Sequence, residues 1–405
     1  MKAWLLFASL PLLLAALPSR GETTEEKGTP ATTPVSPEVA ALKRSVVLHH
    51  AKMIYANYSD CATAAKRMQT AIRQFLAAPD AEKLAAAKKA WTLARQPYLQ
   101  SEAYRFYAGP IDDSDGPEPL LNSWPLDENY IDAPPGSKEP GIVGNVRDYP
   151  QLTPELIESL NEKDGEKNIA CGWHAVEFLL WGRDTSTTGP GNRPVTDYTV
   201  APFAKRRGQY LQACADLIVT KLTELTAEWA PDELGNYRAI FEEGIDYSAE
   251  RIITAITFLT ENELSGERLQ VAWDTRDQEN EHSCFSDTTH QDCVFNAKGV
   301  QNVWRGEYAG IDGKRLSGPG LRDICQKVKP DLKAKLEELV DGNVTKAEAI
   351  PQPFDQAIIS ADDAPGRKSV MAEIASLEDT AAELRELARA MGIEVPDVPP
   401  EGTEG

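Results

Sequence analysis

The sequence predicts an all-α protein made of two antiparallel helical bundles. Apolar residues recur every three or four positions along several long segments, whereas the alternating pattern of a β-strand is almost absent. A chain of 405 residues is also too long for one small core. We therefore predict an N-terminal bundle over residues 37–235, a C-terminal bundle over 236–395 and a short Pro- and Glu-rich tail over 396–405.

The first residues are typical of an export signal. Met1 and Lys2 precede an apolar run that ends near residue 17, and we predict a signal peptide over residues 1–21. Residues 22–36 are rich in Pro and Thr and predict a disordered linker. No later segment is apolar for long enough to predict a transmembrane helix. We expect an exported protein of the periplasm or cell envelope.

The first long helix is predicted to begin after Ser36, a good N-cap that is followed by Pro37. A second long helix should run from Asp80 towards Tyr107, with a kink at Pro97. Its apolar stripe ends in charged residues at Glu102 and Arg105, where the pattern expects core. This end predicts either an internal ion pair or a polar cavity, with Ser101 as a further lining residue.

The remaining elements follow from the same helical period. Residues 109–151 read as loop, and the long segment 277–308 reads as a second loop because it shows little periodicity. Helices are predicted over residues 152–160, 168–182, 203–229 and 247–264, from there to about 276, and over 321–328, 331–339 and 369–391.

The helix over residues 168–182 is apolar almost all the way round, which is typical of a buried helix. His174 and Glu177 interrupt it, three residues apart and so on one face. An imidazole and a carboxylate in a dry environment either bond each other or bind a metal ion. The spacing alone leaves both interpretations open.

Export changes the meaning of the six cysteines, because disulfides are the default in an oxidising compartment. Cys284 and Cys293, nine residues apart in a polar segment, are the predicted pair. The connectivity of the other four stays open. No Cys-x-x-Cys spacing occurs, which disfavours a thiolate metal site.

The formal charge of −21 becomes −23 once Lys2 and Arg20 leave with the signal peptide. Such an acidic chain is a poor partner for nucleic acid or for anionic membranes. It is compatible with a protein that attracts cations.

Several blocks of the chain resemble one known family. Gly172-x-His174-x-x-Glu177 matches the Gly-x-His-x-x-Glu signature of the imelysin family, and residues 91–112, 124–132 and 281–287 resemble further blocks of it. The likeness extends from about residue 40 to 392. It implies two helical bundles with a site near their junction. It also implies kinship with the periplasmic component of bacterial iron-uptake systems, which binds a cation through a His-x-x-Glu pair.

The resemblance implies a set of site residues. His174 and Glu177 are the expected metal ligands, Glu102 a further carboxylate ligand, and Asp112 a weaker one. His282 and Asp287 are expected to line the cavity from the other bundle. Arg105 and Ser101 are expected to line it from the N-terminal bundle.

These observations predict a periplasmic metal-binding protein that serves iron uptake or handling. Iron is the favoured cation, zinc and copper are alternatives, and an envelope iron-transport component is the expected partner. The main alternative is a metal-dependent peptidase. A zinc peptidase normally carries His-Glu-x-x-His, however, and the second histidine is missing from this helix. A purely structural adaptor of the envelope is a third interpretation.

Overall fold

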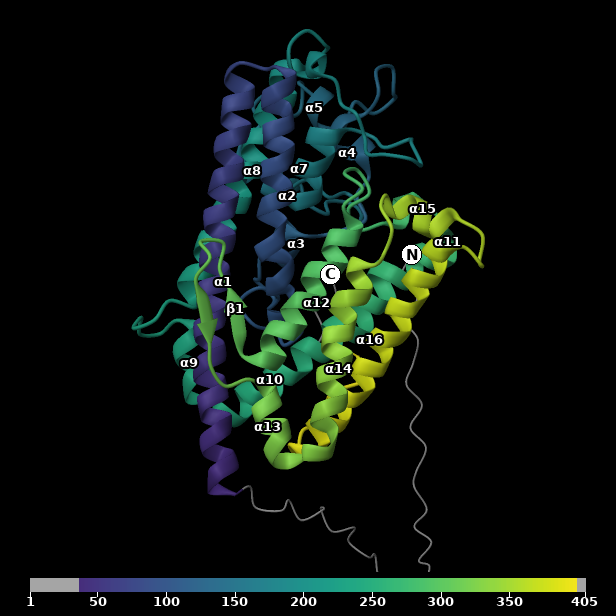
Figure 1. The fold of residues 1–405 in the computed structure, drawn as a ribbon. Helices are drawn as coiled ribbons and strands as arrows, with labels where there is room; N and C mark the ends of the chain where they lie inside the picture. The colour runs from purple at the N-terminus through teal and green to yellow at the C-terminus, as the bar shows by residue number, and fades with distance from the viewer. Residues whose placement is uncertain (1–35, 399–405) are drawn as a thin grey trace, which may run out of the picture. The chain divides into compact units, whose positions relative to one another are not determined.

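The computed structural model describes residues 36–398. The predicted signal peptide, the linker up to residue 35 and the last seven residues lie outside the described residues. From Ser36 onward the chain forms one compact unit, and the regular secondary structure of the described residues is almost all helical, as predicted (Figure 1). Within residues 36–398, no helix has the length and apolar character that crossing a membrane requires.

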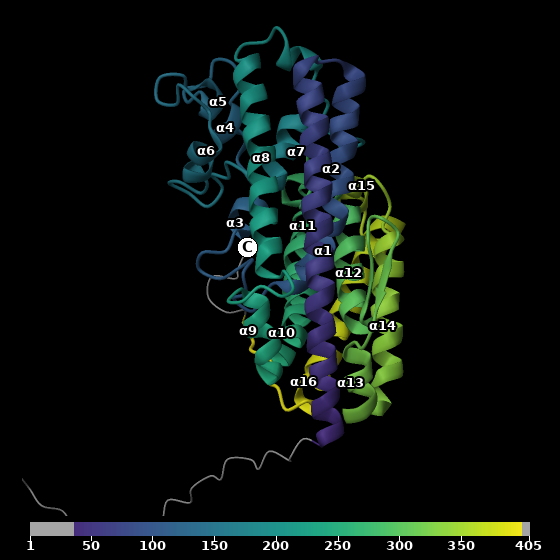
Figure 2. The same ribbon diagram turned by 90° about the vertical axis from the view of Figure 1, so that its left-hand side faces the viewer.

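Three long helices lie side by side in the N-terminal half: α1 (Pro37–Ala77), α2 (Ala81–Ser101) and α8 (Ala204–Glu228) (Figures 1 and 2). The hydroxyl of Ser36 accepts a hydrogen bond from the backbone N–H of Val39, so the predicted N-cap begins α1. A short apolar helix, α7 (Gly172–Trp181), packs against both α2 and α8. This packing buries the element that carries His174 and Glu177.

Three further helices pack together in the C-terminal half: α12 (Thr289–Arg305), α14 (Pro330–Glu348) and α16 (Pro365–Ala390). A continuous helical segment runs beside them as α10 (Ile245–Phe258), the π-helical η3 (Leu259–Gln270) and α11 (Val271–Thr275). The shorter elements are η1 (Glu102–Tyr104), α3 (Glu118–Leu121), α4 (Glu128–Asp132), α5 (Gly141–Gly144), α6 (Pro154–Leu160), η2 (Val195–Tyr198), α9 (Tyr237–Glu243), η4 (Gln278–Asn280), α13 (Leu321–Val328) and α15 (Phe354–Ile359).

Helix α1 belongs to both halves. It packs on α2 and α8, and it also contacts α9, α10, α13 and the strand β1 (Glu307–Ala309) (Figure 2). Helix α2 likewise contacts α12. The division into two bundles at residues 235 and 236 stays a prediction.

The predicted loop over residues 277–308 is wrong in its second half, because α12 occupies most of it. The buried face of α12 includes His290, Asp292 and Asn296 beside Cys293 and Val300. These polar residues interrupt the apolar stripe from which a helix is recognised. The helix was hidden because its inward face is polar.

Two other expectations also differ in detail. The second helix ends at Ser101 and not near Tyr107, because the chain passes through η1 and is extended at Arg105. The predicted loop over 109–151 contains the short helices α3, α4 and α5. A two-stranded antiparallel hairpin of β1 and β2 (Arg315–Ser317) follows α12.

The predicted disulfide between Cys284 and Cys293 is wrong. All six cysteines are buried free thiols. Cys284 packs in the large apolar cluster of the molecule, whereas Cys293 packs in a smaller cluster with Leu264 and Phe354. The two side chains therefore face different cores. Burial raises the pKa of both thiols well above the usual value, so they stay protonated at neutral pH.

Candidate metal site

The start of α7 is set by Gly172. Its φ is +86°, and a Cβ there would lie 2.6 Å from the backbone oxygen of Leu121. Only glycine adopts this conformation and permits this approach at little cost. The helix then buries all ten of its residues, including His174 and Glu177, so their polar atoms need protein partners.

His174 and Glu177 bond each other. The Nδ1 atom of His174 lies 2.9 Å from Oε2 of Glu177. The other oxygen, Oε1, accepts hydrogen bonds from the backbone N–H of Ser286 at 2.9 Å and from its hydroxyl at 2.7 Å. Both oxygens of Glu177 thus have partners, and the carboxylate holds the imidazole in one orientation.

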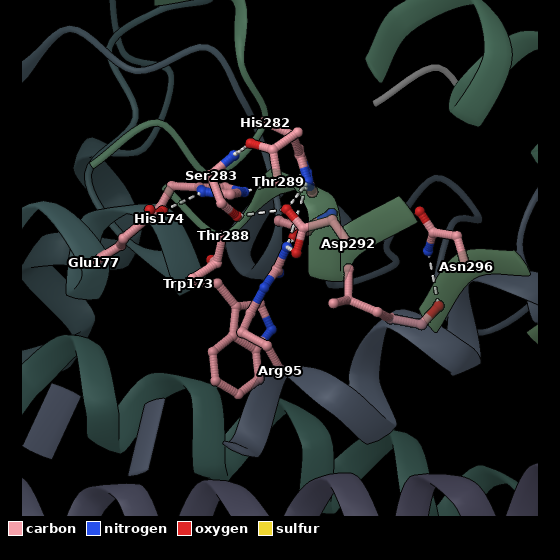
Figure 3. A network of polar contacts seen from close by, with 12 residues as sticks. Arg95, Trp173, His174, Glu177, His282, Ser283, Thr288, Thr289, Asp292 and Asn296 are labelled. Carbon is pink, nitrogen blue, oxygen red and sulfur yellow. Dashed lines mark hydrogen bonds and ion pairs between the residues drawn. The ribbon is translucent and has the colours of Figure 1, made fainter. Parts of the chain in front are cut away.

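The free edge of His174 faces a second histidine. Its Nε2 atom lies 3.3 Å from Nε2 of His282, which comes from the loop after η4 (Figure 3). On its far side, Nδ1 of His282 lies 2.8 Å from Oδ2 of Asp292 on α12. The hydroxyl of Ser283 donates to the same oxygen at 2.5 Å. Four side chains therefore form one line: Glu177, His174, His282 and Asp292.

Burial decides the protonation states of the two histidines and of Glu177. It lowers the pKa of both His174 and His282 well below the usual value, with Arg95 adding to the effect at His174 and Arg268 at His282. Burial also raises the pKa of Glu177 to about 8. Both imidazoles are neutral at pH 7, which is the state that binds metal ions.

Neutral His282 donates its Nδ1–H to Asp292, so its Nε2 carries a lone pair that points at His174. If Glu177 is protonated, it donates to Nδ1 of His174, and the Nε2–H of His174 fills the gap. If Glu177 is ionised, it accepts the Nδ1–H, and two lone pairs then face each other. The space between the two Nε2 atoms consequently needs either a proton or a cation.

A buried arginine supports Asp292. Nη2 of Arg95 lies 3.5 Å from Oδ1 of Asp292, and Nη1 donates to Oδ1 of Asn122 at 2.5 Å. The guanidinium lies over the ring of Trp173, 5.9 Å from its centroid (Figure 3). Arg95 thereby keeps a counter-charge beside the carboxylate that orients His282.

Glu102 lies in an adjoining ion-pair cluster. One of its oxygens pairs with Arg268 and lies 3.6 Å from Arg105, and the other accepts from the amide of Asn122 at 3.1 Å. A ligand role for Glu102 would require these contacts to break, and that role stays a prediction. Arg105 also pairs with Glu118 at 3.2 Å. The charged end of the second predicted helix, at Glu102 and Arg105, therefore forms the internal ion pairs that were one of its two interpretations.

A cavity of about 470 Å³ opens beside these groups. His282, Asn122 and Arg268 line it, as do the carboxylates of Glu118 and Glu263. His282 therefore lines this cavity. Beside His282 the cavity thus offers space in which further ligands can sit.

The other predicted site residues lie elsewhere. Asp112 accepts backbone hydrogen bonds from Phe106 and Gly109 and so fixes its own turn. Ser101 donates to the backbone oxygen of Tyr98 at 2.6 Å. Asp287 lies with Asp184 and Asp355 in a separate acidic cluster. Metal ligation by Asp112 stays a prediction.

Sequence reasoning missed Asp292, Arg95 and Ser286. The pattern predicts a loop at Asp292 and gives no sign that Arg95, within the second predicted helix, has a special role. The one available signal was the spacing from Asp292 to Cys293, Asn296 and Val300, which follows a helical face once polar residues are allowed on it.

Comparison with known proteins finds several similar chains. The curated relative "Iron-regulated protein A" of Synechococcus elongatus is 22% identical over 338 residues, covering 81% of this chain and 82% of the relative. A crystal structure described as an iron-regulated protein A precursor from Parabacteroides distasonis superposes with a TM-score of 0.66 at 18% identity, covering 88% of this chain and 97% of that one.

An imelysin-like protein from Psychrobacter arcticum superposes with a TM-score of 0.64 at 13% identity, covering 90% of this chain and 98% of that one. These structural likenesses show the shared fold. The sequence profile described as Imelysin (Peptidase M75) matches residues 54–384, which is most of the chain. The chain belongs to the imelysin family.

Proposed function

We propose that this protein is an exported cation-binding protein of iron handling that holds its cation between the two imidazoles. The observation that carries the proposal is the 3.3 Å approach of Nε2 of His174 to Nε2 of His282. Each imidazole is held from behind by a carboxylate, Glu177 or Asp292. Metal-binding histidines are usually oriented by a carboxylate in this way.

The spacing fits a shared metal ion. Imidazole nitrogens bind zinc at about 2.0–2.1 Å, and two such nitrogens at a tetrahedral angle lie roughly 3.3–3.4 Å apart. Water or cargo groups in the adjoining cavity would complete the coordination. In this assignment Glu177 orients His174, and its predicted role as a direct ligand would require it to release Ser286.

Neutral imidazoles suit iron, zinc and copper. The names of two relatives refer to iron regulation, so iron is the first cargo that we propose. The predicted signal peptide supports a location in the periplasm or cell envelope. There it would pass the cation to an iron-transport component.

Removal of either imidazole should abolish tight binding. Loss of a residue that only orients a ligand typically lowers metal affinity about 10- to 100-fold. Loss of a metal ligand itself should therefore lower the affinity at least about 100-fold. We expect this result for His174→Ala and His282→Ala, measured by calorimetry with zinc and, under anaerobic conditions, with ferrous iron.

His49→Ala is the matched control. Its imidazole is also buried, but it bonds the backbone oxygen of Gly306 outside the site. The control should bind metal like the wild type. Wild-type affinity in both His174→Ala and His282→Ala would overturn the proposal.

Metal affinity should also depend on pH. Below pH 8 Glu177 carries a proton in the metal-free protein, and metal binding requires its release so that Nδ1–H of His174 can be donated to the carboxylate. Zinc affinity should therefore fall by up to about tenfold per pH unit as the pH falls below 8, and level off above it. The histidines do not titrate in this window, because their pKa values are lowered.

Calorimetry at pH 7 in buffers of different ionisation enthalpy should detect about one proton released per metal ion. Glu177→Gln has no such proton, and its binding should be weaker and nearly independent of pH between 7 and 9. Equal wild-type affinity at pH 6.5 and 8.5 would contradict the assignment.

A metal-dependent peptidase is the second candidate. The observation that favours it is that His282 supplies, in space, the second imidazole that the motif lacks. Glu177 is poorly placed to act as a general base, because His174 and Ser286 occupy both of its oxygens. Metal-dependent cleavage of an unfolded polypeptide by wild-type protein, lost in Glu177→Gln, would favour the peptidase.

A further inference from the structure

A second group of carboxyls includes residues of the loop that carries His282. Asp184 follows α7, Asp287 lies in the loop before α12, and Asp355 lies on α15. One oxygen from each lies within 4.8 Å of the others, and all three side chains are at least nine-tenths buried. Three separate segments of the chain thus bring acidic groups to one point.

A fourth carboxyl points to a ligand there. Glu281 is fully buried, lies next to Asp355, and its Oε1 has no hydrogen-bond partner among the described residues. The same holds for both carboxylate oxygens of Asp287 and for Oδ2 of Asp184 and of Asp355. Buried oxygens without partners are rare and costly in folded proteins.

No arginine or lysine offsets this group. Across residues 36–398, none of the ion pairs includes Asp184, Glu281, Asp287 or Asp355. In the neighbouring clusters, by contrast, Asp292 pairs with Arg95 and Glu102 with Arg268. The acidic cluster therefore lacks the basic partner that Asp292 and Glu102 have.

We propose that Asp184, Asp287 and Asp355, with Glu281 beside them, form a binding site for a hard divalent cation such as calcium. Carboxylate oxygens alone are the ligands that such cations prefer. Calcium binds oxygens at about 2.3–2.6 Å, so opposite ligands lie up to about 5 Å apart, which matches the spread of this cluster.

The site differs from the histidine pair in its ligands and in its position. Ser286, which holds Glu177, directly precedes Asp287, and His282 directly follows Glu281. A cation bound at the cluster would tie this loop to α15 and to the end of α7. It would thus brace the loop without touching the imidazoles.

The competing arrangement keeps the cluster neutral through shared protons. Burial raises the pKa of Asp287 to about 8 and that of Glu281 well above its usual value. In that arrangement, calcium has no effect, and replacing one carboxyl by an amide changes only the stability of the protein. The two arrangements therefore differ in the response to calcium.

The test uses the mature protein after treatment with a chelator. Calorimetry and thermal unfolding with calcium alone should detect one bound ion and a rise in melting temperature. In Asp287→Asn and Asp355→Asn, the affinity should fall at least tenfold and the calcium-dependent rise should disappear. Asp287 has a φ of +53°, which asparagine also tolerates, so the first variant is expected to fold.

Asp232→Asn is the matched control, since Asp232 also has a positive φ but is exposed. It should bind calcium like the wild type. The double variant His174→Ala/His282→Ala should also retain calcium binding, which separates this site from the proposed iron site. Absence of calcium binding by the wild type at millimolar concentration, or unchanged binding in both asparagine variants, would overturn the proposal.

Discussion

Glu102→Gln should lower the free energy of unfolding by about 3–5 kcal/mol, because it removes the fully buried counter-charge that two buried guanidinium groups share. Glu102 is 1% exposed and faces both Arg268 and Arg105. Glu118 and Glu263 remain nearby, but burial raises the pKa of Glu118 to about 7, so it is a weak substitute. Urea unfolding with a chelator present measures the loss without any contribution from bound metal.

The chelator also separates the two roles considered for Glu102. A residue that acts only as a metal ligand would leave the stability of the metal-free protein almost unchanged. The control is Glu38→Gln, which removes an exposed carboxylate paired with Lys327. Exposed pairs contribute about 0–1 kcal/mol, so this variant should unfold like the wild type. A loss below about 1 kcal/mol in Glu102→Gln would remove its assignment as an essential counter-ion.

Glu373→Leu should stabilise the protein at pH 8 by up to several kcal/mol. Glu373 lies on α16, is 0% exposed, and neither of its carboxylate oxygens has a hydrogen-bond partner among the described residues. Burial raises its pKa to about 8 from an ordinary value of 4.5. The folded protein therefore binds a proton that the unfolded chain releases in this interval.

The sign follows from this difference. The folded-state pKa of Glu373 lies above its unfolded value, so its contribution to stability is fully present below pH 4.5. It decreases at up to about 1.4 kcal/mol per pH unit and is lost by about pH 8.

Leucine has no such dependence, so the difference in unfolding free energy between Glu373→Leu and wild type should grow steadily between pH 5 and 8. Urea unfolding at several pH values measures this difference. A difference that does not change with pH would show that the Glu373 carboxyl keeps an ordinary pKa. Glu378→Leu, on the same helix but exposed, should show no such trend.

The sequence predicted the parts of this protein that depend on local order. The helical period gave α1, α7, α8 and α16 within a few residues, because each buries a mainly apolar stripe. It did not give α12, whose buried face is built around Asp292 and Asn296. A polar residue gives no sign in the sequence that it is buried until the residue that it bonds is known.

In the candidate site, too, local features could be predicted and contacts between distant residues could not. The spacing of His174 and Glu177 is local, and it correctly placed them on one buried face. The partner imidazole lies 108 residues away in the sequence, and the arginine that pairs with Glu102 lies 166 residues away. Spacing carries no information about such pairs, so the sequence alone could not predict that Glu102 lies against Arg268 or that His282 lies against His174.

The length of α1 bears on how the proposed cation could be exchanged. Its 41 residues form a rod about 60 Å long, and the rod packs on helices of both halves. A rod shared in this way prevents the clamshell closure by which many binding proteins capture and release ligands. Exchange of the proposed cation would then pass through the cavity that His282 lines, without a relative movement of the two halves. The shape of that cavity, and not a hinge, would accordingly limit what reaches the imidazole pair.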